Sequence, residues 1–113
     1  MINIVNYKTG KLKLSVDKKE RLIDELHTAI SEGVDFSFCD FRRLDLRGLK
    51  VSNYSFEGCY FMFSDLRNCC FCCVNFVNAM FLYAKTVGTS FKFCPFETND
   101  IEWLKHLSKN ETV

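Results

Sequence analysis

Apolar side chains recur at every fifth position through the middle of this chain, and that spacing limits the fold more than any other feature. Nine of the thirteen positions are Phe, and only Thr86 is not apolar. Neither the 3.6-residue period of an α-helix nor the two-residue period of a flat strand brings such positions to one face. A chain that turns a corner every five residues does bring these positions to one side. The sequence therefore predicts inward side chains at Phe36, Phe41, Leu46, Val51, Phe56, Phe61, Leu66, Phe71, Phe76, Phe81, Thr86, Phe91 and Phe96.

A second series lies two residues before each member of the first, and it is mostly small or apolar. We predict that it also faces inward, where a thiol acts as a compact hydrophobic group. Four of the seven cysteines belong to this series: Cys39, Cys59, Cys69 and Cys94. The other three lie in the stretch NCCFCCVNF, residues 68–76, at outward positions: Cys70, Cys72 and Cys73.

The cysteine-rich stretch suggests a metal site, but its spacing argues against one. A structural zinc site needs four ligands that converge on one ion, whereas neighbouring side chains on opposite sides of a wall diverge. We therefore predict no metal site and no cofactor. The outward thiols remain open to oxidation or to adventitious metal binding.

The five-residue spacing resembles the pentapeptide-repeat family, whose unit is Ala-(Asp/Asn)-Leu-X-X, from Val34 to Phe96 without a gap. The resemblance implies a mainly β fold: a right-handed quadrilateral β-helix, or solenoid, of about three coils. Large residues at three small inward positions depart from the family pattern, and few units carry the usual Asp or Asn. The large residues are Leu44, Leu49 and Tyr54.

The two ends of the chain lack the repeat and are expected to cap it. Residues 1–33 read as a β-hairpin, with alternating apolar residues in 2–16, and a helix from Asp17 that Gly33 ends. Residues 34–97 form the repeat, and residues 98–113 form a C-terminal helical cap and tail. Caps cover backbone that an open end exposes. In longer members of the family a C-terminal helix instead makes a dimer contact, so a homodimer is an open alternative.

Composition excludes several classes of partner. The 113 residues suit one domain, and 15 Lys and Arg against 14 Asp and Glu leave a formal charge of +1, so no strong field favours nucleic acid or an anionic membrane. The first residues contain neither a signal-peptide core nor a spanning segment. We therefore expect a cytoplasmic protein whose thiols stay reduced.

Catalysis has little support in the sequence. The only histidines, His27 and His106, fall in the two expected terminal helices. Neither a Gly-rich phosphate loop nor a nucleophile elbow is present. We predict that the protein is not an enzyme.

A binding function would depend on the outward side chains. These can be sorted by face, because every twentieth residue returns to the same face of the expected coil. One face carries six apolar groups where water is expected, and we call it the aromatic wall: Tyr60, Met62, Phe63, Met80, Leu82 and Tyr83. Such a patch is typical of protein contacts. The sequence leaves open whether the N-terminal hairpin covers this wall instead. A secondary, basic surface is predicted at Arg42, Arg43, Arg47 and Lys50.

The first functional hypothesis is a non-enzymatic interaction module that binds another protein and modulates it by inhibition. Such a module would suit a phage or mobile-element factor that acts on a host protein. Some pentapeptide-repeat proteins instead imitate DNA and inhibit type II topoisomerases. The repeat region here has five acidic and seven basic residues, the wrong balance for such mimicry. Direct nucleic-acid binding through the basic surface is the second alternative.

Overall fold

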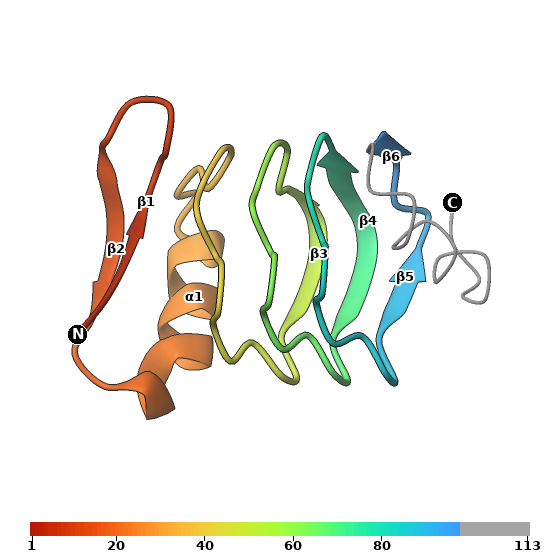
Figure 1. The fold of residues 1–113 in the computed structure, drawn as a ribbon, viewed down its shortest axis with the longest axis horizontal. Coiled ribbons are helices and arrows are strands. Elements are labelled where there is room, and N and C mark those ends of the chain that lie inside the picture. Colours follow the sequence, from red (N-terminus) through yellow and green to blue (C-terminus); the bar gives the residue numbers. More distant parts are fainter. Residues whose placement is uncertain (98–113) are drawn as a thin grey trace.

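The elements of the chain follow one another from an N-terminal hairpin through one helix to parallel strands (Figure 1). The computed structural model describes residues 1–97. Strands β1 (Ile2–Val5) and β2 (Leu12–Val16) precede the 3-10 turn η1 (Lys19–Arg21) and helix α1 (Leu22–Ser31). Strands β3 (Lys50–Ser55), β4 (Cys70–Val77), β5 (Ser90–Lys92) and β6 (Phe96–Glu97) follow.

The hairpin expected in residues 2–16 is present. Strands β1 and β2 pair antiparallel, with Ile2 opposite Val16. Asn6 organises the turn, because its side-chain oxygen accepts hydrogen bonds from the backbone N–H groups of Lys8 at 2.8 Å and Thr9 at 3.0 Å. Such Asx contacts are a common way to stabilise a turn. Two of the alternating apolar side chains, Ile4 and Val16, are fully buried.

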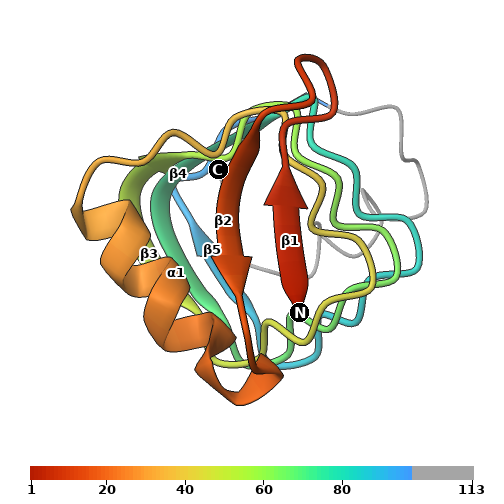
Figure 2. The ribbon, with the colours of Figure 1, turned by 90° about the vertical axis from the view of Figure 1, so that its left-hand side faces the viewer.

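Helix α1 follows from an apolar stripe whose members lie three and four residues apart. Leu22, Leu26 and Ala29 are buried along one side of the helix, as the period of an α-helix predicts. The regular helix begins at Leu22 after η1 rather than at Asp17. Figure 2 shows the hairpin across the N-terminal end of the molecule, with β2 between β1 and α1.

The middle of the chain pairs with itself at intervals of twenty residues. Val51 lies opposite Phe71, which lies opposite Phe91, in parallel register across β3, β4 and β5. Strand β6 pairs with β4 through Phe76 and Phe96. Outside these strands the same interval gives only isolated bridges, which join Asp40 to Tyr60, Tyr60 to Met80, Asp45 to Asp65, and Asp65 to Lys85.

The prediction of a right-handed quadrilateral β-helix of about three coils was wrong. Residues 1–97 form one two-stranded antiparallel sheet, one four-stranded parallel sheet and one α-helix, and no closed or solenoid sheet is found among them. The overall extents of 36 × 26 × 24 Å describe a compact body rather than a rod. The predicted C-terminal helix in 98–113 lies outside the described residues.

Tight corners recur along the chain at the same five-residue interval. A residue with positive φ occurs at every fifth position from Phe38 to Phe93, with φ between 52° and 77°. This left-handed conformation bends the backbone, and two of the corners, Asn53 and Cys73, lie inside strands β3 and β4. Gly58 is required at its corner, because a Cβ atom there would lie 2.3 Å from the Phe38 ring.

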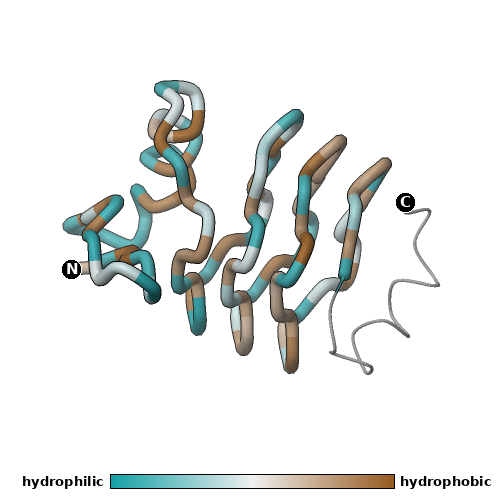
Figure 3. Tube along the Cα trace, turned by 90° about the horizontal axis from the view of Figure 1, so that it is seen from above, coloured by the Kyte–Doolittle hydropathy of each residue, from teal (hydrophilic) through white to brown (hydrophobic). Residues whose placement is uncertain are grey.

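The core consists of the side chains with the five-residue spacing. Of the thirteen predicted positions, only Thr86 and Phe96 are partly exposed, and the rest are buried. Their rings stack at the twenty-residue interval: Phe61 lies 5.2 Å from both Phe41 and Phe81 between ring centroids. Figure 3 shows hydrophobic stretches recurring from one stacked segment to the next. The core thus fixes which side chains remain outside, including the candidate site.

Candidate functional site: an exposed aromatic wall

The structure brings together the six residues of the aromatic wall. Tyr60 and Met80 form a parallel bridge, and the backbone N–H of Phe63 donates to the carbonyl oxygen of Leu82 at 3.1 Å. The rings of Phe63 and Tyr83 stack with their centroids 5.2 Å apart and their planes 25° apart. The predicted grouping is therefore present as one continuous strip.

Two corners hold the stacked pair in place. Phe63 and Tyr83 both have φ of 61° and lie twenty residues apart, so each ring leaves the backbone at the same point of successive turns. Arg43, with the same φ of 61°, precedes them in this column. Its Cζ atom lies 4.5 Å from the Phe63 ring centroid, within the range of a cation–π contact. A cation and two aromatic rings therefore form one short column.

The wall is most exposed at this column and beside it. Tyr83 is 70% exposed, Phe63 48% and Leu82 37%. Tyr60, Met62 and Met80 are half-buried. Exposed apolar groups that adjoin one another are uncommon on a small monomer unless they serve a contact.

The N-terminal hairpin covers one end of the wall. Tyr7 stacks on Tyr60 with ring centroids 3.9 Å apart and planes 7° apart, and its hydroxyl donates to the carbonyl oxygen of Gly58 at 2.6 Å. Burial, with the neighbouring Tyr60 hydroxyl, raises the pKa of Tyr7 to about 12. The question left open by the sequence is answered in part, because the hairpin shields Tyr60 and leaves Phe63 and Tyr83 accessible.

Sequence reasoning missed both Tyr7 and the stacking role of Arg43. Tyr7 lies outside the five-residue repeat, so no periodic signal linked it to Tyr60. The twenty-residue interval places Arg43 on the same face as Phe63, but Arg43 was counted with the basic surface, and its contact with the Phe63 ring was not predicted.

The arginines of the predicted basic surface each make a local contact of their own. Arg42 makes a two-point contact with Asp40, with nitrogen–oxygen distances of 2.9 and 2.8 Å. Arg47 makes the same contact with Asp45 at 2.8 Å and also lies 3.8 Å from Asp65. Arg42 and Arg47 are thus each paired with an aspartate, and Arg43 lies over the Phe63 ring. Lys50 is the exposed first residue of β3.

Each aspartate that pairs with the arginine two residues ahead has a lowered pKa. The cause is mainly the hydrogen bond from the arginine side chain, which favours the ionised carboxylate. The affected groups are Asp40, Asp45 and Asp65, paired with Arg42, Arg47 and Arg67. These pairs form a solvated charged face beside the aromatic wall rather than a cluster of free acids.

The seven cysteines divide as the repeat predicts. Four are fully buried, and the thiols of Cys59 and Cys69 each contact a backbone carbonyl oxygen at 3.0 Å. Burial raises the pKa of Cys39 to about 11 and that of Cys69 to about 12. The exposed thiols are Cys70, Cys72 and Cys73.

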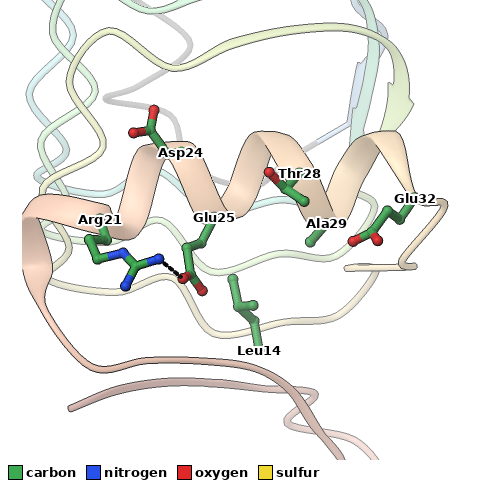
Figure 4. A pocket seen from close by; sticks show the side chains of 7 residues that line it. All are labelled: Leu14, Arg21, Asp24, Glu25, Thr28, Ala29 and Glu32. Carbon is green, nitrogen blue, oxygen red and sulfur yellow. Dashed lines mark ion pairs between the residues drawn. The ribbon is translucent and has the colours of Figure 1, made fainter.

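A shallow cavity of about 390 Å³ lies between Leu14 of β2 and helix α1 (Figure 4). Its charged side chains come from α1 and the residues on either side of it, and Arg21 pairs with Glu25 at 3.3 Å, the contact drawn as a dashed line. His27 is not among its lining residues; its Nε2 accepts a hydrogen bond from the Lys50 backbone N–H at 3.2 Å. The lining offers mixed charge and no nucleophile paired with a base. His106 lies outside the described residues.

Within residues 1–97, no helix has the length and apolar composition needed to cross a membrane. Comparisons with protein-family models, with curated proteins and with solved structures give no match to this chain. The resemblance to the pentapeptide-repeat family therefore stays a prediction.

Proposed function

We propose that this protein is a non-enzymatic interaction module that binds and modulates another protein through the exposed part of the aromatic wall. The observation that carries the proposal is the stacked pair of Phe63 and Tyr83, 48% and 70% exposed, with Leu82 beside it. Isolated exposed apolar residues are common, but an ordered, adjoining set is typical of a contact surface.

The geometry suits binding because the rings are already ordered. Both are held at corners of the backbone and packed against each other, so a partner would lose little conformational freedom in ordering them. Tyr and Arg are enriched among the residues that dominate binding energies. Burying one such aromatic ring contributes on the order of 2 kcal/mol.

The column also suggests the chemistry of the partner. Phe63 and Tyr83 present apolar faces, and Arg43 places a cation at one end of them. The matching surface is apolar with a carboxylate at one edge, which would pair with the guanidinium group. The half-buried Met62 and Met80 add adaptable contacts at the border.

The test uses a photo-cross-linking amino acid in place of Tyr83, with Lys85 as the matched control position two residues away. We expect one partner protein to be captured from Tyr83 and not from Lys85. The purified partner should then bind the native chain and lose at least tenfold in affinity for Leu82→Asp and Tyr83→Asp, both of which should remain folded. Equal capture at the two positions, or unchanged affinity of both variants, would contradict the proposal.

No observation favours the two nucleic-acid alternatives. A DNA mimic needs a surface dominated by free acids, whereas Asp40, Asp45 and Asp65 are each paired with arginine. Direct binding to nucleic acid needs cations that follow a phosphate backbone. The arginines of the predicted basic surface instead contact their own aspartates or, for Arg43, an aromatic ring.

A further inference from the structure

Two exposed thiols lie close together at a corner away from the aromatic wall. Cys72 and Cys73 have their Sγ atoms 3.8 Å apart, and both side chains are exposed. Cys73 has φ of 57°, and this bend turns consecutive side chains to the same outer side. The sequence argument against a metal site considered neighbours on opposite sides of a wall, whereas these two thiols are both exposed.

The separation of the two sulfur atoms matches one edge of a zinc–thiolate tetrahedron. Zinc binds thiolate sulfur at about 2.3 Å, so two sulfurs on one tetrahedral ion are about 3.8 Å apart. The separation of the pair is therefore that of two ligands on one ion. Closed zinc sites use four protein ligands.

One copy of the described chain supplies only two of them. No group of three or more His, Cys, Asp or Glu side chains within residues 1–97 is placed to hold a metal ion. Cys70 is exposed on the same strand but does not join such a group. The missing two ligands must come from outside this part of the chain.

We propose that Cys72 and Cys73 from two copies of this chain bind one Zn²⁺ as a four-thiolate site and so join the copies across a two-fold axis. A two-fold axis presents the same pair from each copy, which completes the tetrahedron. Binding releases four protons, one from each thiol, and leaves the ion with four thiolates and a net charge of −2. Neither an oxidant nor a reductant takes part.

The surroundings of the pair suit such a contact. Lys92 lies in register with Cys72 across β4 and β5, so two copies bring two ammonium groups to offset the charge of the site. Phe93 follows at the next corner of the column that contains Cys73 and is 72% exposed. The contact between copies would bury this ring, which adds apolar area to the metal ligands.

Titration of the intact, reduced, metal-free protein with Zn²⁺ alone tests the proposal. Native mass spectrometry and light scattering should show one zinc ion per two chains and a dimer that EDTA reverses. Co²⁺ should give the intense absorption of tetrahedral thiolate coordination. Cys72→Ser and Cys73→Ser should remain monomeric with zinc, whereas Cys70→Ser should dimerise like the native chain.

Three outcomes would overturn the proposal: one zinc ion bound per monomer, equal loss in Cys70→Ser and Cys72→Ser, or no zinc-dependent dimer. Phe93→Ala should weaken the dimer without removing thiolate absorption, which separates the apolar contact from coordination. Tyr83→Asp should dimerise normally with zinc. Failure of the zinc-dependent dimer to form can therefore be distinguished from failure of a partner to bind the aromatic wall.

Discussion

At the scale of single residues, position within the five-residue repeat decides what a side chain does. Phe61 and Phe63 are the same residue type two positions apart, yet Phe61 is fully buried between two other rings and Phe63 is 48% exposed. One belongs to the core and the other to the aromatic wall. Residue type alone does not distinguish structure from function in this chain.

This contrast predicts different costs for the same substitution. Phe61→Ala should lower the free energy of unfolding by about 3–5 kcal/mol, because it removes a buried ring and leaves a cavity. Phe63→Ala should change it by less than about 1 kcal/mol while weakening partner binding. Urea denaturation of both variants measures the difference. Similar losses for the two would contradict the assignment of Phe63 to the surface.

At the scale of elements, the hairpin is attached to the rest of the molecule by contacts far apart in sequence. Tyr7 bonds to the carbonyl of Gly58 and stacks on Tyr60. The backbone N–H of Tyr7 also donates to the Phe38 carbonyl oxygen at 3.0 Å. The hairpin thus covers the edge of the aromatic wall and sets how much of it a partner can reach.

Tyr7→Phe should lower the free energy of unfolding at neutral pH by about 1 kcal/mol, the usual contribution of one hydrogen bond. The pKa of Tyr7 is raised to about 12 from about 10 in unfolded chains. Stability from this group is therefore fully present below about pH 10 and is lost as the pH rises towards about 12. The native chain should lose more stability than Tyr7→Phe between these pH values, measured by urea denaturation.

Tyr83→Phe is the control for that comparison, because Tyr83 is 70% exposed at the other end of the wall. It should leave both the neutral-pH stability and its alkaline decline close to those of the native chain. If Tyr7→Phe behaves like this control, the hydroxyl of Tyr7 does not anchor the hairpin.

At the scale of the whole molecule, the sequence was sufficient to predict which side chains are buried and which are exposed, but not how the strands pair. The repeat correctly placed Phe56 and Phe76 in the core and Cys72 outside, because a period determines which positions share a face. The closed β-helix was wrong, because regular pairing at the twenty-residue interval is confined to one four-stranded sheet and gives isolated bridges elsewhere in residues 1–97. The period of the buried positions does not determine which segments form hydrogen-bonded ladders.

The candidate site was likewise predictable only in part from the sequence. The repeat grouped Phe63, Leu82 and Tyr83 on one face, and the structure places them together. The cover over Tyr60 was not predictable, because Tyr7 reaches it across 53 residues with no shared period. Whether the exposed part binds a protein stays a proposal that the cross-linking experiment tests.

The most direct test of the account is the rate at which each of the seven thiols reacts with an alkylating reagent in the native, reduced protein, followed by mass spectrometry of the peptides. The account predicts rapid labelling at Cys70, Cys72 and Cys73, and labelling at Cys39, Cys59, Cys69 and Cys94 only after denaturation, because these four are fully buried. Labelling of Cys59 or Cys69 as fast as Cys72 would contradict the inward and outward assignment on which the core, the aromatic wall and the zinc proposal all depend.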